Sequence, residues 1–148
     1  MTIDDLKTLL FGFSGRINRA KYWAALGIYF AIVVIFVVSG MVLSTVSEAA
    51  LIALMIGAFI VYIPILISSV AVGIKRLHDR DKNGWWLLIF YLLPGVLSAI
   101  GEAGGGAIVF TIASFAISMW AIVELGALRG TAGTNRYGPD PLASQPTP

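Results

Sequence analysis

Cysteine is absent from this 148-residue chain, and histidine occurs only once. Without cysteine there are no disulfides, no thiolate nucleophiles and no zinc–thiolate sites. The single histidine, His78, excludes a metal site built from several histidines. The sequence therefore predicts no bound metal and no cofactor, and it assigns no residue to catalysis.

Charge is also scarce. Only 12% of the residues are charged, whereas soluble domains carry roughly 25%. Hydrophobic residues make up 58% of the chain, which is more apolar surface than a small water-soluble domain can bury. The composition predicts an integral membrane protein with a single domain over residues 1–148.

Long apolar runs account for most of this hydrophobicity. They cover residues 22–43, 49–74, 85–100 and 107–128. A membrane-spanning helix needs about 20 residues, and apolar runs form helices in lipid because every backbone amide must be hydrogen-bonded. The third run is the shortest and contains Pro94, so we expect it to depend on its flanks. The runs predict an all-α, four-transmembrane-helix bundle.

A short amphipathic segment over residues 2–13 precedes the first run. Its apolar residues recur at helical spacing, namely Ile3, Leu6, Leu10 and Phe13. Thr2 and Asp5 have the spacing of a capping box, which starts a helix at once. We expect a short helix that lies in the membrane interface with its apolar face in the lipid. The alternative is a frayed terminus.

The basic residues indicate the orientation of the chain. All ten of them precede the first run, lie between the second and third, or follow the fourth: Lys7, Arg16, Arg19 and Lys21; Lys75, Arg76, Arg80 and Lys82; Arg129 and Arg136. Basic loops stay in the cytoplasm. Both termini and the 75–82 loop are therefore predicted to be cytoplasmic, with residues 130–148 as a polar tail.

Small residues predict where the helices pack, since membrane helices associate through close backbone approach. Two stripes have the spacing of one helix face. They are Ala49, Ala53 and Gly57 in the second run, and Thr111, Ser114 and Ser118, flanked by Ala107 and Ala121, in the fourth. We expect both stripes inside the bundle. The hydroxyl stripe would either serve packing alone or line a polar pathway.

Prolines and one acid interrupt the apolar runs. Pro64 and Pro94 are expected to kink their helices because proline lacks the amide hydrogen. Glu124 is expected near the headgroups, paired with Arg129 or with cations of the 75–82 loop. An ionisable residue within a span is also a candidate for function, so that alternative stays open.

Several charged and polar residues are predicted to meet on the cytoplasmic face. This candidate binding cluster comprises Arg16, Arg19, Arg76, His78, Asp79, Arg80, Asn135 and Arg136. Within it, Asp79 is expected to orient one arginine through a bidentate pair. Beside the cluster lie aromatic residues of the kind that anchor helix ends at the interface: Tyr22, Trp23, Trp85 and Trp86.

Three sequence blocks carry a family resemblance. They are FGFSGRINRAKYW at residues 11–23, KRLHD followed by NGWW within residues 75–86, and GTAGTNRYGPDP at residues 130–141. These ordered motifs, spread over nearly the whole chain, resemble the family called domain of unknown function 805. The resemblance implies a small bacterial inner-membrane protein with four spans, and it supplies no activity, substrate or catalytic residue. The chain departs from the family pattern at Lys75 and at residues 80–82, where arginine and a glycine-containing stretch are common.

Three classes of function are consistent with these features. The leading hypothesis is a non-enzymatic structural or regulatory membrane protein. The second is a transporter, channel or lipid-binding component that uses the candidate binding cluster. The third is a membrane enzyme centred on His78 and Asp79, although the sequence has no serine elbow, zinc pair or phosphate-binding loop to accompany them.

The expected partners follow from the same features. They are the lipid bilayer, including anionic headgroups attracted by the basic cluster, and a second copy or another membrane protein. Nucleic acid is not expected, because the basic residues lie next to the membrane and are interspersed with acids.

Overall fold

A computed structural model describes residues 2–104 and 106–143, and within these ranges the chain is helical and has no strand. The helices are α1 (Ile3–Phe11), α2 (Arg19–Leu43), α3 (Glu48–Asp79), α4 (Trp86–Tyr91), α5 (Leu93–Gly104), α6 (Ala107–Ile122) and the π-helix η1 (Val123–Ala127). The predicted all-α class is confirmed.

Within the described residues, four helical segments are long and apolar enough to cross a membrane, as predicted. They are α2, α3, the combined stretch of α4 and α5, and α6 together with η1. The Asn18 side chain accepts a hydrogen bond from the Lys21 N–H and so starts α2, and Ser47 caps α3 in the same way. Helix α3 continues to Asp79, beyond the apolar run that ends at residue 74. Its last turn therefore carries charged residues out of the apolar region.

Proline has different effects in the two spans that contain it. Helix α3 continues without a break through Pro64. The third span is divided at Leu92 into α4 and α5, and Pro94 follows two residues later. Because Pro94 has no N–H, the turn before it lacks one helical hydrogen bond. A helical break is thus present beside Pro94 and absent at Pro64, and the helical stretch after the break reaches Gly104, four residues further than the run at 85–100.

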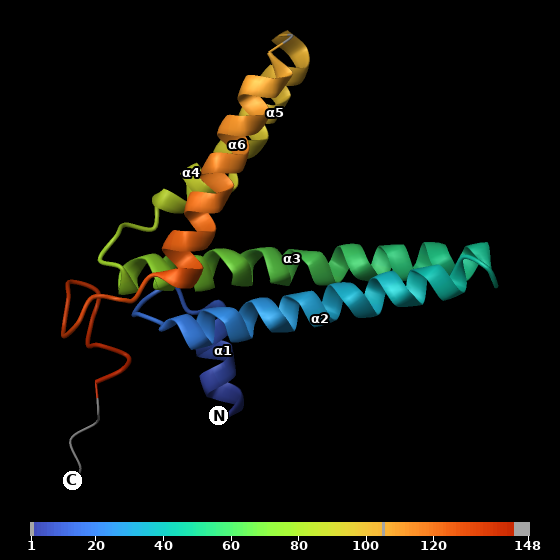
Figure 1. Ribbon diagram of the computed structural model, residues 1–148. Coiled ribbons are helices and arrows are strands. Elements are labelled where there is room, and N and C mark those ends of the chain that lie inside the picture. The colour runs from blue at the N-terminus through green and yellow to red at the C-terminus, as the bar shows by residue number, and fades with distance from the viewer. Residues whose placement is uncertain (1, 105, 144–148) are drawn as a thin grey trace.

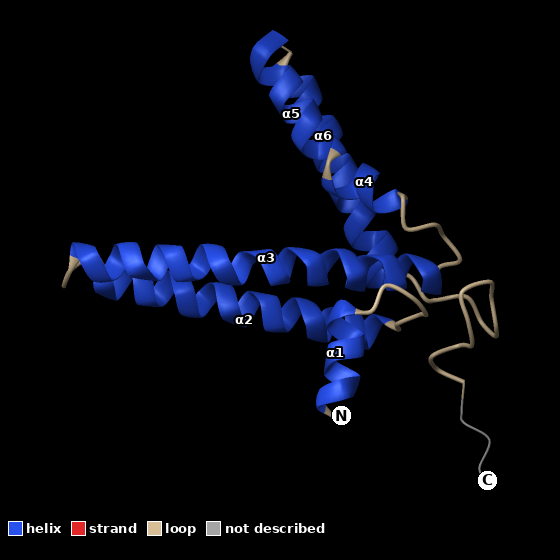
Figure 2. Ribbon diagram, turned by 180° about the vertical axis from the view of Figure 1, so that it is seen from behind, coloured by secondary structure: helices blue, strands red, loops and turns tan. Residues whose placement is uncertain are grey.

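The spans form two antiparallel hairpins. Helix α2 lies beside α3, and α5 lies beside α6; the two hairpins diverge from a shared end (Figures 1 and 2). In the first hairpin the Tyr29 hydroxyl lies 2.6 Å from the Ser68 hydroxyl, and Gly40 faces Leu51 and Leu54. The bundle predicted from the sequence is thus open at the far ends of the spans.

The small-residue stripe of α3 was predicted to lie inside the bundle, and that prediction is wrong. Ala49 and Ala53 are exposed, and a side chain at Gly57 would meet nothing within 4 Å. The reason is that α3 faces α2 through a different side of the helix, the one that carries Leu51 and Leu54. The diverging second hairpin leaves the stripe uncovered.

The hydroxyl stripe of α6 is only partly inside. The Ser114 side chain is buried against α5 and donates to the carbonyl oxygens of Pro94 (2.9 Å) and Phe110 (2.8 Å). Ser118 donates to the Ser114 carbonyl, whereas Thr111 is exposed. The two inward hydroxyls bond to backbone oxygens within the hairpin, which favours packing over a polar pathway. The Ser114 hydroxyl also covers the carbonyl of Pro94 at the interrupted turn.

Helix α1 has the capping box that the sequence predicts. The Thr2 N–H donates to the Asp5 carboxylate (2.8 Å), and the Asp5 N–H donates to the Thr2 hydroxyl (3.1 Å). The bond from the Thr2 N–H lowers the pKa of the Asp5 carboxyl. At its other end α1 meets Lys75, whose ammonium donates to the carbonyl oxygens of Thr8 and Leu9. Cations stabilise the carboxyl end of a helix, so both ends of this short helix are secured.

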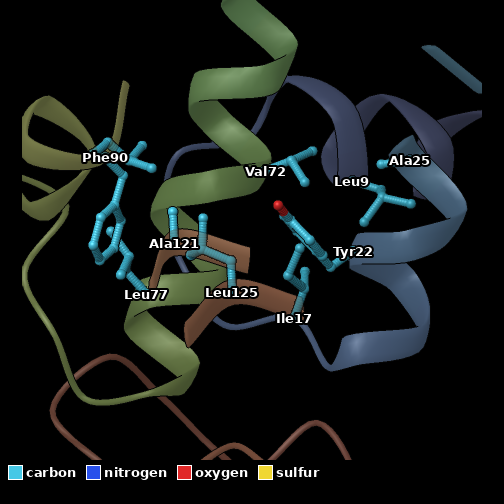
Figure 3. Close-up of a cluster of buried hydrophobic side chains, with 10 residues drawn as sticks. Leu9, Ile17, Tyr22, Ala25, Val72, Leu77, Phe90, Ala121 and Leu125 are labelled. Carbon is cyan, nitrogen blue, oxygen red and sulfur yellow. The ribbon is translucent and has the colours of Figure 1, made fainter. Parts of the chain in front are cut away.

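The buried apolar core is small and lies at the shared end of the hairpins (Figure 3). It gathers side chains from α1, the loop before α2, the start of α2, the end of α3, α4, the end of α6 and η1: Leu9, Ile17, Tyr22, Ala25, Val72, Leu77, Leu87, Phe90, Ala121 and Leu125. Most apolar side chains along the spans are exposed, as expected where lipid is the solvent. The core thus fixes the ends of the helices from which the charged loops emerge.

The α5–α6 contact leads to a stability prediction. A methyl group added at Gly101 would lie 2.8 Å from Phe110 Cβ and 3.2 Å from Ala107 Cα, whereas at Gly95 on the same helix it would meet nothing. Both Gly→Ala changes gain helix propensity, but overpacking costs about 1–3 kcal/mol. Relative to Gly95→Ala, we expect Gly101→Ala to lower the free energy of unfolding by that amount. Circular dichroism during titration of sodium dodecyl sulfate into detergent micelles would measure it, and equal stabilities would contradict the packing.

Candidate functional site

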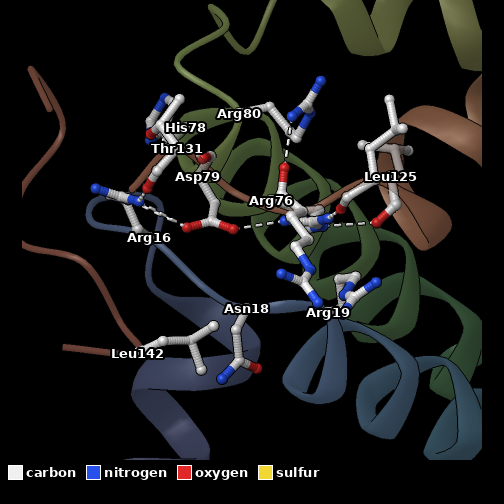
Figure 4. A network of polar contacts seen from close by, with 12 residues as sticks. Arg16, Asn18, Arg19, Arg76, His78, Asp79, Arg80, Leu125, Thr131 and Leu142 are labelled. Atoms are coloured by element: carbon white, nitrogen blue, oxygen red, sulfur yellow. Dashed lines mark hydrogen bonds and ion pairs between the residues drawn. The ribbon is translucent and has the colours of Figure 1, made fainter. Parts of the chain in front are cut away.

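Three segments far apart in sequence meet at the shared end of the hairpins. We call this assembly the polar cap and define it as residues 12–19, 75–82 and 123–143. All eight residues of the candidate binding cluster lie within it, and Figure 4 shows the central contacts. The predicted convergence of the three sequence blocks is therefore present in the structure.

Arg76 lies at the centre of the polar cap and is completely buried. Its Nε donates to the Leu125 carbonyl (2.6 Å), and its Nη1 donates to the Asp79 carboxylate (2.5 Å). Its Nη2 donates to the Leu128 carbonyl. One guanidinium therefore connects the end of α3 to the end of α6, across the two hairpins.

Asp79 balances two buried arginines rather than the single one predicted. Its Oδ2 faces Arg76, and its Oδ1 accepts from Nε (3.2 Å) and Nη2 (3.1 Å) of Arg16. The side chains of all three residues are at most 3% exposed. The sequence prediction paired the carboxylate with one arginine because the burial of both could not be read from the loop spacing.

Arg16 also holds the tail. Its remaining N–H groups donate to the carbonyl oxygens of Thr131 (2.6 Å), Gly133 (2.7 Å) and Gly138 (3.2 Å). Gly133 and Gly138 have φ values of +74° and +133°, which a side chain would strain. These turns aim the three oxygens at a single guanidinium, so the tail folds around Arg16.

The last turn of α6 widens into η1, and its free carbonyl groups are capped by side chains from the first hairpin. Helix ends leave up to four carbonyl groups without an internal partner. Besides the two bonds from Arg76, Trp23 Nε1 donates to the Gly126 oxygen (3.1 Å) and Arg19 Nη1 donates to the Ala127 oxygen (2.9 Å). The sequence does not predict these acceptors, because every residue type has the same backbone carbonyl oxygen.

The tail is also tied to the end of α3. The Thr131 N–H donates to the Asp79 carbonyl (2.8 Å), and Asn135 Nδ2 donates to the His78 carbonyl (2.9 Å). A side chain at Gly130 would overlap the Asp79 carboxylate, so this position must approach closely. Asn135, a member of the candidate binding cluster, thus joins the tail directly to α3.

His78 has a packing role in the polar cap. Its ring stacks on Tyr137 at 3.8 Å between centroids with 5° between the planes, and its Nδ1 lies 3.2 Å from the Gly15 carbonyl oxygen. Further along the tail, the backbone N–H groups of Leu142 and Gly133 hold the pKa of the Asp140 carboxyl below its usual range. The histidine and this carboxylate are therefore both engaged in holding loops in place.

A second ion-pair group surrounds Glu124, which is 4% exposed. Its Oε1 accepts from Arg80 Nε (3.0 Å) and pairs with Lys82 Nζ (3.1 Å). The predicted pairing with cations of the 75–82 loop is confirmed. Arg136 pairs with Asp81 at the exposed edge of the polar cap.

The four predicted interface anchors have different environments. Tyr22 is buried in the core, and Trp86 packs edge-on against Trp120 at 5.4 Å. Trp23 is half exposed and caps η1, whereas Trp85 is 72% exposed. Only Trp85 is as exposed as expected of a residue that serves solely as an interface anchor, because the other three lie where helices contact one another.

Two features limit what chemistry the polar cap can support. In the part of the chain that the structure describes, no group of three or more His, Cys, Asp or Glu side chains could hold a metal ion. Over the same residues, every buried side-chain nitrogen and oxygen has a hydrogen-bond partner. The described charges are thus mostly engaged with one another.

Comparison with known proteins agrees with the three sequence blocks. The family model described as "Protein of unknown function (DUF805)" matches residues 10–139. The chain belongs to the DUF805 family. The polar cap of this DUF805 protein contains the end of the matched region and begins two residues after its start, so both ends of the matched region lie close to the cap.

Several Escherichia coli (strain K12) proteins are similar to this DUF805 chain. "Uncharacterized protein YiiR" is 33% identical over 139 residues, which cover 88% of this chain and 86% of the relative. "Inner membrane protein YhaI" is 31% identical over 134 residues with the same coverage, and "Inner membrane protein YhaH" is 28% identical over 132 residues, covering 88% and 87%. No solved structure matches. With four apolar helices, these relatives assign the protein to the inner membrane as a multi-pass protein.

The buried ion pairs of the polar cap lead to a second prediction. Asp79→Asn leaves Arg16 and Arg76 buried without their counter-charge, and breaking such a pair costs about 3–5 kcal/mol. Asp81→Asn removes a pair whose side chains are 46% and 61% exposed, which costs at most about 1 kcal/mol. We expect Asp79→Asn, and not Asp81→Asn, to destabilise the protein in detergent and to speed tryptic cleavage after Arg136. Equal cleavage rates in the two variants would show that Asp79 does not hold the tail.

Proposed function

We propose that this protein is a non-enzymatic structural or regulatory component of the inner membrane, and that the polar cap is a folded cytoplasmic platform for other proteins. The observation that carries the proposal is the engagement of the charged residues with one another. Arg16, Arg76 and Asp79 are buried and fully hydrogen-bonded inside the cap. Groups in this state hold a surface in shape, whereas a catalytic base or nucleophile must reach a reacting atom.

The environment of His78 supports the same proposal. A general base needs a positioned partner and access to a substrate proton. Here one face of the ring is covered by Tyr137 and Nδ1 faces a backbone oxygen. Asp79, the other residue of the enzyme hypothesis, has two arginines on its carboxylate. Both residues are therefore better suited to hold the cap than to transfer protons.

The exposed surfaces of the polar cap and of the spans suggest two kinds of partner. Ala132, Thr134 and Pro139 are exposed on the outer side of the tail, where a protein partner would have access. Along the spans, the open hairpins expose apolar faces that lipid, a second copy or another membrane protein would cover. The bilayer is the partner common to all of these arrangements.

A complementation experiment tests the non-enzymatic proposal. His78→Phe keeps an aromatic ring for stacking on Tyr137 but cannot transfer a proton. We expect a deletion strain expressing His78→Phe to match a strain expressing the parent in its metabolite and lipid profiles. A photo-crosslinking residue at Thr134 should yield discrete protein adducts in both strains. A compound that accumulates in the deletion and His78→Phe strains, but not with the parent, would contradict the proposal.

The orientation of the chain can be measured directly, because it has no cysteine of its own. With the polar cap in the cytoplasm, as the basic residues indicate, Thr134→Cys should resist a membrane-impermeant maleimide in spheroplasts and react in inside-out vesicles. Val46→Cys, in the loop between α2 and α3, is the matched control and should behave in the opposite way. Labelling of Thr134→Cys in intact spheroplasts would reverse the proposed topology.

A further inference from the structure

A cavity of about 680 Å³ lies between α1 and the edge of the polar cap, and Arg16 and Lys75 of the cap are among its lining residues. Its walls come from α1, from the loop that leads to α2, and from the charged ends of α2 and α3. Its lining includes Asp4, Asp5 and Leu9 of α1, Ser14 of the loop, and Lys21 and Lys75.

Lys75 is the unusual residue of this cavity, since it is a buried cation without a counter-charge. It is 3% exposed and donates to the carbonyl oxygens of Thr8 (2.7 Å) and Leu9 (2.6 Å). Among the residues that the structure describes, it forms no ion pair, whereas buried Arg16 and Arg76 share Asp79. A buried charge is costly unless it is paired. An anion in the cavity would supply the missing charge to the third N–H of the ammonium.

The cavity has opposite charges at its two ends. Lys75 lines it at the carboxyl end of α1, where it contacts the Thr8 and Leu9 oxygens, and Asp4 and Asp5 line it at the first turn; Lys21 is a second cation of the lining. Asp5 is engaged in the capping box, whereas the Asp4 side chain is 91% exposed and pairs with the exposed Lys7 at 3.6 Å. Asp4 and Thr8 are four residues apart, about 6 Å along the helix axis. A ligand that fits this arrangement has an anionic group and an ammonium group close together.

The position of the cavity further restricts the chemical class of the ligand. Lys75 directly follows the apolar run at 49–74, and Lys21 directly precedes the run at 22–43. Both therefore lie where a bilayer changes from acyl chains to headgroups. Phosphate is the anion of that layer, and the buried Leu9 and Ile17 give the cavity an apolar wall.

We infer that this cavity binds a phosphoethanolamine group, with the phosphate against Lys75 and Lys21 and the ammonium against Asp4. The group would come either from a phosphatidylethanolamine lipid or from a soluble phosphoethanolamine ester. Phosphatidylglycerol shares the phosphate and lacks the ammonium, so it is the discriminating competitor.

The full-length protein in nanodiscs with equal amounts of phosphatidylethanolamine and phosphatidylglycerol tests this inference. After extraction into detergent, native mass spectrometry would count the lipids that stay bound. We expect the parent to retain phosphatidylethanolamine preferentially, by about tenfold, the value of one charge-assisted contact. Asp4→Asn should abolish that preference and leave phosphate binding intact, whereas Glu48→Gln, at the other end of the first hairpin, should change nothing.

Lysine variants test the phosphate contact. Lys75→Met should lose retention of both lipids, and Lys75→Arg should restore it. Because Lys75→Met also removes the cap of α1, the exposed Lys21→Met provides a second variant, expected to weaken retention without loss of helix content. Equal retention of the two lipids by the parent, or parent-like retention by both Met variants, would overturn the inference.

A competition experiment distinguishes the source of the group. Soluble phosphoethanolamine is titrated into the detergent-solubilised protein and followed by ³¹P NMR. Binding that is sensitive to Asp4→Asn and displaces the retained lipid supports a soluble ligand. Preferential lipid retention that soluble phosphoethanolamine does not reduce supports the lipid headgroup.

Discussion

The buried guanidinium of Arg76 is the interaction on which the rest of the structure depends. Its three donor groups satisfy the Asp79 carboxylate and two carbonyl oxygens at the end of α6. In lipid the two hairpins gain no hydrophobic free energy by associating, because acyl chains are as apolar as leucine. A polar contact is therefore needed to fix the placement of one hairpin relative to the other. The fully buried Arg76 guanidinium, with its fixed acceptors, provides that contact.

Two further constraints follow from this burial. Arg76 and Arg16 need a shared negative charge, which places Asp79 one turn after Arg76 on α3. The carbonyl groups that receive Arg76 must be free of helical partners, and they are those of Leu125 in η1 and of Leu128 directly after it. Away from this end the hairpins share few contacts, so the helix ends are ordered by charge while the spans diverge into the lipid (Figure 1).

The sequence predicted whatever depends on local chemistry. Apolar run length located the spans, the Thr2–Asp5 spacing located the start of α1, and Pro94 located the interruption of the third span. The loop charges also predicted that Glu124 would meet cations. The sequence did not show the backbone acceptors of η1, because peptide oxygens are the same at every position. Small residues in α3 were misassigned for a related reason: Ala49 and Ala53 permit close packing but do not require it.

The way in which Arg16 binds the tail has a consequence for how this segment tolerates change. Its three tail contacts are all to main-chain oxygens, those of Thr131, Gly133 and Gly138. The contacts of Arg16 therefore depend on the path of the tail backbone rather than on its side chains, whereas Asn135 and Tyr137 add side-chain contacts to His78. If the glycine turns and the close contact between Gly130 and Asp79 are kept, the exposed positions of the tail can be substituted freely. The residues on the exposed surface of the tail can thus change while the tail stays attached in the same way.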